Sequence, residues 1–186
     1  LVSVIPCSDK DNILLATRLG KAIRFDVNDV RVFVGRGSSG ERGIKLKPND
    51  YVVSMSLIHK MEKTYILSVT ENGFGKRTPI EDYRMTNRGG QGVANIECST
   101  RNGPVVASYV ASEDDQIMLV TNSGKLIRIR VHGGEGDSIR IAGRKTQGVR
   151  LFDVDDEEKV VSVALLTESD EDGNSEEDNN AVATDQ

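Results

Sequence analysis

The sequence contains one short segment three times. It reads Ile66-Leu67-Ser68-Val69-Thr70-Glu71-Asn72-Gly73, and its pattern returns at Ile13-Leu14-Leu15-Ala16-Thr17-Arg18-Leu19-Gly20 and at Ile117-Met118-Leu119-Val120-Thr121-Asn122-Ser123-Gly124. The three threonines are 53 and 51 positions apart, and each precedes a glycine by three. Four residues after each glycine stands an arginine: Arg24, Arg77 or Arg128. Agreement at so many offsets predicts an internal repeat of about fifty residues.

Two further landmarks follow each copy. The first is a glycine before a β-branched residue, in Arg42-Gly43-Ile44, Gln91-Gly92-Val93 and Gln147-Gly148-Val149. The second is an apolar pair, in Val52-Val53-Ser54, Val105-Val106-Ala107 and Val160-Val161-Ser162, and the opening Leu1-Val2-Ser3-Val4 matches it. We therefore divide residues 1–167 into the end of a preceding repeat (1–8) and three whole repeats (12–59, 62–112 and 115–167), followed by a tail (168–186).

Each repeat reads as short strands. Apolar runs of Val, Ile and Leu alternate with turn residues, and no stretch keeps a helical period over about ten residues. The steps Leu19-Gly20, Asn72-Gly73 and Ser123-Gly124 lie between two such runs, where a hairpin turn needs a residue at positive φ. Four strands per repeat predict an all-β, propeller-like array of blades. The chain has no tryptophan, so the WD40 signature is absent.

The composition excludes several classes of protein. Hydrophobic residues make up 37% of the 186 residues and mean hydropathy is -0.37. No apolar run approaches the ~18 residues of a membrane span, so we expect no membrane partner. The N-terminus lacks the features of a signal peptide and an initiator Met, which suggests a piece of a longer protein. Cys7 and Cys98 are far apart and His59 and His132 are isolated, so we expect no zinc site or disulfide and a reducing cytosol.

Charge is distributed unevenly along the chain. The formal net charge is -5, but the tail, residues 168–186, holds eight acids and no base. Residues 1–167 hold 24 bases against 21 acids. The tail has too few apolar residues to fold, so we predict that it is disordered, and we hypothesise that it competes with a polyanion for the basic body.

Basic residues recur at the repeat spacing. A row of them along one edge of the blades would suit the phosphates of a DNA duplex, because each neutralised phosphate releases a counterion. An ordinary solvated rim is the alternative, and the constant offset of Arg24, Arg77 and Arg128 is also compatible with a hydrogen bond inside each blade. The predicted DNA-binding residues are Lys21, Arg24, Arg36, Arg42, Lys76, Arg77, Arg88, Lys125, Arg128, Arg144, Lys145 and Arg150.

Other motifs have simpler interpretations. Residues Gly35 to Gly40 fit G-x-G-x-x-G, but Gly43 and Pro48 follow too soon for the helix that a dinucleotide site requires, so we interpret the motif as a repeat loop. The acidic runs 114–115 and 155–158 fall between predicted strands, where turns are usually acidic. We therefore assign no catalytic residue, metal or cofactor to this chain.

Several of these segments together resemble a known family. They are Thr70-Glu71-Asn72-Gly73-Phe74-Gly75-Lys76-Arg77-Thr78, Asn87-Arg88-Gly89-Gly90-Gln91-Gly92-Val93, Arg42-Gly43-Ile44-Lys45-Leu46 and Gly143-Arg144-Lys145-Thr146-Gln147-Gly148-Val149-Arg150. With the acidic tail, they look like the C-terminal domain of bacterial DNA gyrase A. The resemblance covers residues 1–167, and the family's hallmark Gln-Arg-Arg-Gly-Gly-Lys-Gly box has no full copy here.

The resemblance implies a β-pinwheel, a six-bladed array in which neighbouring blades exchange a strand, here without its first blades. It implies a basic outer rim that wraps duplex DNA in a bacterial, nucleoid-associated enzyme. That type II topoisomerase introduces negative supercoils, uses ATP and Mg²⁺ elsewhere in the assembly, and contains two A and two B subunits. The alternatives are the C-terminal domain of topoisomerase IV and a propeller-like scaffold that binds proteins.

Overall fold

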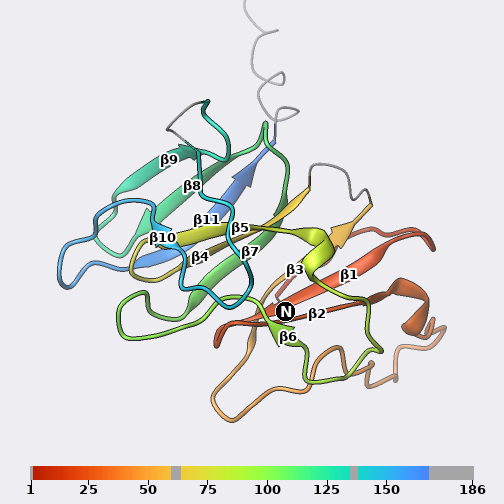
Figure 1. Cartoon of the computed structure of the whole chain (residues 1–186). Coiled ribbons are helices and arrows are strands. Elements are labelled where there is room, and N and C mark those ends of the chain that lie inside the picture. Colours follow the sequence, from red (N-terminus) through yellow and green to blue (C-terminus); the bar gives the residue numbers. More distant parts are fainter. Residues whose placement is uncertain (1, 60–63, 135–137, 168–186) are drawn as a thin grey trace, which may run out of the picture.

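The computed structural model describes residues 2–59, 64–134 and 138–167, which form three antiparallel sheets arranged as neighbouring blades (Figure 1). The first sheet has the order β3-β1-β2-β6 and consists of β1 (Asn12–Thr17), β2 (Lys21–Asp26), β3 (Val52–Ile58) and β6 (Val93–Ala94). The second has the order β10-β5-β4-β7 and consists of β4 (Tyr65–Thr70), β5 (Phe74–Pro79), β7 (Val105–Ala111) and β10 (Val149–Arg150). The third has the order β11-β8-β9 and consists of β8 (Gln116–Thr121), β9 (Leu126–Arg130) and β11 (Val160–Leu166).

The all-β prediction is confirmed. Within the described ranges the helical elements are the 3-10 turns η1 (Val27–Asp29) and η2 (Ile80–Asp82), and no helix is long and apolar enough to cross a membrane. The three predicted hairpins also form, β1-β2, β4-β5 and β8-β9. Their turn glycines Gly20, Gly73 and Gly124 have φ of 77°, 76° and 84°, a region that costs a side chain energy and glycine nothing.

The fourth strand of a sheet comes from the next repeat. β6 belongs to the second repeat but pairs with β2 of the first, through Lys21↔Ala94 and Ala22↔Val93. β10 of the third repeat pairs in the same way with β5 of the second. This is the strand exchange that the family resemblance implies. The third sheet has three strands among the described residues, and the outer edge of β9 carries no ladder partner there.

The strands β3, β7 and β11 lie innermost, where the blades meet (Figure 1). The Ser54 hydroxyl on β3 donates to the Ser108 carbonyl on β7 at 2.8 Å, and the Tyr109 hydroxyl on β7 donates to the Val163 carbonyl on β11 at 2.8 Å. An apolar cluster with Leu14 and Ile66 fills the space between the first and second sheets. A larger cluster fills the space between the second and third.

Burial along the strands follows from this stacking. In β8 every second residue is buried, because only one face of the third sheet packs on a neighbour. In β4 nearly every residue is buried, because the second sheet has a sheet on each face. The larger cluster includes Ile117 and Leu119 of β8 and Val163 of β11.

Two expectations concern the ends of the chain. Residues 2–7 form no strand, although Val2 to Val4 resemble the start of β3, β7 and β11. Each of those strands pairs with the first strand of its own repeat, and the described residues offer no such strand to Val2 to Val4. The predicted disordered tail, residues 168–186, lies outside the described residues.

Candidate nucleic-acid interface

Charge separates between the inner and outer parts of the blades. The innermost strands β3, β7 and β11 contain no Asp, Glu, Lys or Arg. The segments that cross the outer edge, 30–47, 83–96 and 138–152, contain one acid, Glu41, and eleven bases. These are Arg31, Arg36, Arg42, Lys45, Lys47, Arg84, Arg88, Arg140, Arg144, Lys145 and Arg150. We call these three segments the outer loops.

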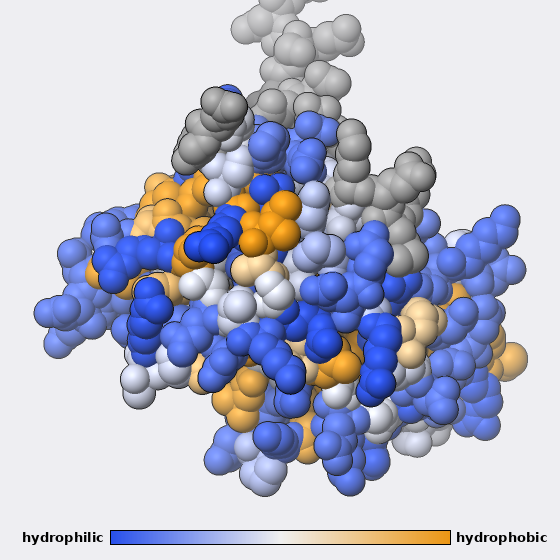
Figure 2. Space-filling view, in the orientation of Figure 1, coloured by the Kyte–Doolittle hydropathy of each residue, from blue (hydrophilic) through white to orange (hydrophobic). Residues whose placement is uncertain are grey.

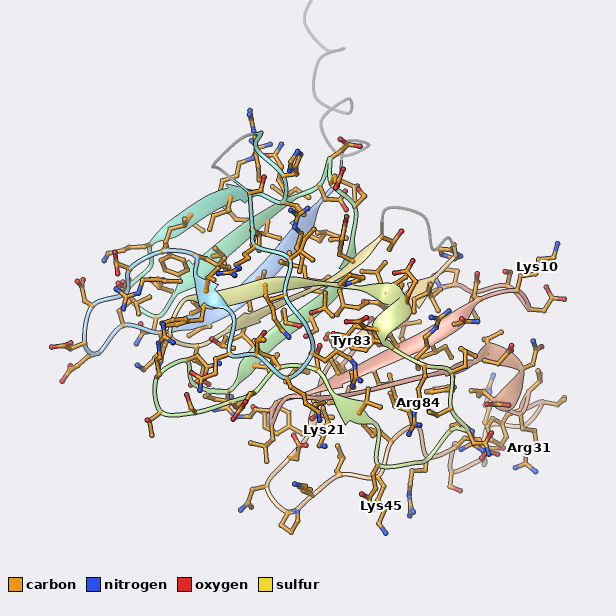
Figure 3. All side chains as sticks on the ribbon, in the orientation of Figure 1. Lys10, Lys21, Arg31, Lys45, Tyr83 and Arg84 are labelled. Atoms are coloured by element: carbon orange, nitrogen blue, oxygen red, sulfur yellow. The ribbon has the colours of Figure 1, made fainter. Side chains whose placement is uncertain are left out.

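On the first sheet three lysines line one groove. Lys21, Lys45 and Lys47 line it together with Ile44, Leu46, Asp50 and Gln91, and its volume is about 230 Å³. Figure 3 shows Lys21 and Lys45 on the outer side of this sheet, with Arg31 and Arg84 further along. The Lys45 amide donates to the Gly90 carbonyl at 2.8 Å, so an outer loop of the second repeat forms part of the support. Three ammonium groups and one carboxylate make a groove that favours phosphate.

On the second sheet two exposed arginines lie beside one buried ring. The guanidinium carbons of Arg101 and Arg150 are 4.8 and 5.6 Å from the centroid of Phe74. Arg150 also forms an ion pair with Asp153. The Phe74 ring holds both guanidinium groups near the hairpin turn at Gly73, and both arginines are exposed.

Three predicted DNA-binding residues lie in the interior, which corrects their expected place on the rim. Lys76 is fully buried and its Nζ donates to the Gly143 carbonyl at 2.5 Å. Arg77 is buried, and its Nε donates to the Ile139 carbonyl at 2.6 Å. Arg24 is buried, with Nη1 on the Tyr83 carbonyl and Nη2 on Asn12 Oδ1. Arg24 and Arg77 each stand four residues after a turn glycine. From this position the side chain donates a hydrogen bond to the outer loop of the next repeat.

Two further predicted residues are half-buried and hold neighbouring backbone. Arg88 donates to the carbonyls of Asp29 and Arg42 and pairs with Glu41 at 2.6 Å. Arg144 donates from Nη1 to the Ala94 carbonyl at 3.1 Å. Both side chains therefore join one outer loop to another part of the chain.

The remaining predicted residues lie toward solvent. Lys21 is half-buried, and Arg36, Arg42, Lys145 and Arg150 are exposed. On the third sheet Lys125 pairs with Glu158 at 2.8 Å and Asp155 at 2.9 Å, and these hydrogen bonds raise the pKa of its ammonium group. Arg128 is exposed and donates from Nε to Gln116 Oε1 at 2.6 Å.

The sequence reasoning missed several exposed bases, most of them on the outer loops. They are Arg31, Lys45, Lys47, Arg84, Arg101, Arg130 and Arg140. The sequence pattern could have identified Lys45 and Lys47 as candidates. They alternate with Ile44 and Leu46, and in an extended segment this alternation puts both lysines on the same side of the chain. Arg101 follows no repeat pattern, and only the fold brings it next to Arg150.

The motifs considered for nucleotide or metal binding do not form such a site among the described residues. Residues 35–40 form a turn and no helix, as the loop interpretation predicts, and no other atom comes within 4 Å of an added Cβ on Gly35, Gly37 or Gly40. Among the residues with described positions, no three His, Cys, Asp or Glu side chains gather as metal ligands. Figure 2 shows a largely hydrophilic face with an apolar patch near β9, where Leu126 is 69% exposed.

Comparison with known proteins gives consistent matches. The model of the DNA gyrase C-terminal domain, beta-propeller, matches residues 11–59, 64–103 and 115–167. DNA gyrase A of Rickettsia typhi is 38% identical over 223 residues, and that of Rickettsia felis is 39% identical over 224 residues. These alignments cover 95% and 96% of this chain and 24% of each relative, so the chain spans about a quarter of their length.

A solved structure shows a similar arrangement. The crystal structure of the C-terminal domain of DNA topoisomerase IV aligns with a TM-score of 0.75 and 28% identity, over 84% of this chain and 47% of that one.

Proposed function

The chain belongs to the family of DNA gyrase C-terminal domains, and from that membership we propose that it binds duplex DNA along its outer loops without reading the base sequence. The observation that carries the proposal is the separation of charge between uncharged innermost strands and outer loops with eleven bases and one acid. Lysine and arginine on loops suit phosphate, whose contacts position a duplex but carry no sequence information. Aromatic residues make up only 4% of the chain, which disfavours the base stacking of single-strand binders.

The bases lie on successive blades, which favours bending of the duplex. The lysine groove belongs to the first sheet, whereas Lys145, Arg150 and Arg101 lie on the second. We propose that a duplex in contact with both sites curves around the array, and smooth bending by 40–90° costs on the order of 1–6 kcal/mol. Several phosphate contacts must therefore act together, which is the requirement for wrapping.

We propose that this binding serves a bacterial, ATP-dependent type II topoisomerase that introduces negative supercoils. In that assembly the remainder of gyrase A, together with gyrase B, would cleave DNA and use ATP and Mg²⁺, as a heterotetramer of two A and two B subunits in the nucleoid. This chain would present the wrapped duplex.

The test is affinity for a 40-bp duplex as a function of salt concentration, combined with a topology assay on relaxed circular DNA in the presence of a nicking-closing enzyme. We expect a steep negative slope of log affinity against log salt and a shift in topoisomer distribution. Binding without a shift in the topoisomer distribution would show that the chain contacts DNA but does not wrap it. No binding at low salt by a chain with folded circular dichroism would favour the protein-binding scaffold.

Topoisomerase IV remains the nearest alternative, because the solved C-terminal domain of that enzyme aligns with 84% of this chain at a TM-score of 0.75. The match of the gyrase model to all three repeats favours gyrase. Attaching the chain to the catalytic part of each enzyme distinguishes the two, since only the gyrase hybrid should introduce negative supercoils into relaxed DNA.

A further inference from the structure

Three successive side chains on β5 hold one outer loop by its carbonyl groups. Lys76 Nζ donates to the Gly143 carbonyl at 2.5 Å, Arg77 Nε to the Ile139 carbonyl at 2.6 Å, and Thr78 Oγ1 to the Ala142 carbonyl at 2.8 Å. We propose that these residues position the basic loop 139–146 for DNA, so that binding depends on side chains that do not touch it. The inference rests on the proposed function of the outer loops.

The backbone of β5 adds to this attachment. The Arg77 amide donates to the Arg140 carbonyl at 2.9 Å, and the Ala142 amide donates to the Arg77 carbonyl at 2.8 Å. Four of the five carbonyls from Ile139 to Gly143 therefore accept a hydrogen bond from β5. A loop held at so many consecutive groups keeps one conformation, and its side chains leave it in fixed directions.

The first sheet shows that a blade with an exchanged strand forms without this arrangement. The positions equivalent to Lys76 and Thr78 are Ile23 and Phe25 in the first repeat and Ile127 and Ile129 in the third. In the first sheet Ile23 and Phe25 offer no side-chain donor to the corresponding loop, and Arg24 Nη1 donates to the Tyr83 carbonyl at 3.3 Å. Apolar residues thus suffice to build a blade, and a buried ammonium group must be compensated by hydrogen bonds.

The loop that receives the extra bonds is also the one with the densest positive charge. Segment 139–150 carries Arg140, Arg144, Lys145 and Arg150 and no acid, whereas segment 83–94 carries Arg84 and Arg88. Like charges on a short loop repel one another, and this repulsion favours open conformations. The bonds from β5 oppose that tendency and hold the backbone on either side of the exposed Arg140 and Lys145 in place.

The test is a double-mutant cycle in DNA binding by the 186-residue chain. Thr78→Val removes one bond to the loop without changing charge, and Lys145→Ala removes a phosphate-binding group. We expect Lys145→Ala alone to weaken binding about threefold. We expect Thr78→Val to weaken it by a similar factor, and the double variant to be little weaker than Thr78→Val alone, because a lysine on a loosened loop contributes less. Lys76→Met should reproduce the pattern.

Ser54→Ala is the matched control, because Ser54 Oγ also donates to a buried carbonyl at 2.8 Å but lies between β3 and β7. Its effect should add fully to that of Lys145→Ala. Amide hydrogen exchange gives a readout independent of DNA: exchange at Ala142 should rise about tenfold in Thr78→Val and stay unchanged in Ser54→Ala.

The outcomes separate the two proposals. Full additivity of Thr78→Val and Lys145→Ala, or unchanged exchange at Ala142, would overturn the positioning role while leaving DNA binding in place. Failure of the unmodified folded chain to bind the duplex at low salt would overturn the proposed function and the positioning role with it.

Discussion

Gly148 lies against the backbone of Gly75, so closely that a Cβ on Gly148 would stand 2.7 Å from the Gly75 carbonyl oxygen. This close approach occurs where β10 of the third repeat enters the second sheet. Gly92 has the same relation to the first sheet, at 2.4 Å from the Ala22 carbonyl oxygen. The residue before each exchanged strand must therefore be glycine, because a side chain there would prevent the strand from approaching the neighbouring sheet closely enough to pair with it.

Gly148→Ala should destabilise the second sheet. The alanine would combine a φ of 79° with the collision at Gly75, and we expect the free energy of unfolding to fall by about 2 kcal/mol or more. Urea denaturation measures the change. Gly143→Ala is the control on the same loop, because no other atom lies within 4 Å of its added Cβ. Equal stability of the two variants would contradict the packing argument.

Asn95 should be critical for the packing between the first two blades. Its Oδ1 accepts hydrogen bonds from the hydroxyls of Tyr83, at 2.6 Å, and Ser68, at 3.2 Å, and its Nδ2 donates to Ser108 Oγ at 2.9 Å. Asn95→Leu would remove the acceptor of the buried Tyr83 hydroxyl and leave Ser68 and Ser108 bonded only to each other across the site, so we expect a loss of about 2–4 kcal/mol in urea denaturation. The exposed Asn87→Leu should change stability by less than about 0.5 kcal/mol, and a similar loss there would refute a network effect.

Lys76 should make stability depend on pH. Burial, helped by the charge of Arg144 and opposed by that of Asp82, lowers its pKa from 10.5 to about 8. Between these values the unfolded chain binds more protons than the folded one, so stability rises with pH.

Thermal melts from pH 7 to 10 would measure this effect. The difference in melting temperature between the unmodified chain and Lys76→Met should stay constant below pH 8 and then shift in favour of the unmodified chain. A difference that remained constant up to pH 10 would show that Lys76 has the same pKa folded and unfolded.

The lysine groove should contribute measurably to the salt dependence of DNA binding. Lys45→Ala combined with Lys47→Ala should reduce the magnitude of the slope of log affinity against log salt by about 1.8, or 0.9 for each phosphate that is no longer neutralised. Lys159→Ala removes the same type of charge beside the innermost strands, among Val160 and Val161, and should leave the slope unchanged. An equal change in both variants would indicate a general effect of net charge.

Much of the fold was predictable because it rests on local patterns. The period of about fifty residues, the turn glycines at 20, 73 and 124 and the apolar strand runs specify hairpins within a single repeat. The exchange of β6 and β10 entered only through the family resemblance, since nothing in residues 91–94 or 147–150 indicates which sheet they join.

The site was less predictable, as Lys76 and Lys145 show. Both are lysines that stand next to an arginine in the sequence, yet one is fully buried on β5 and the other is exposed on the loop that Lys76 holds. Sequence alone therefore determined the repeat, the strands and the excess of positive charge near the outer loops, because these depend on residue type and spacing. Only the tertiary structure decided which charges face solvent and which bind carbonyl groups, because burial depends on what a neighbouring repeat places over each strand.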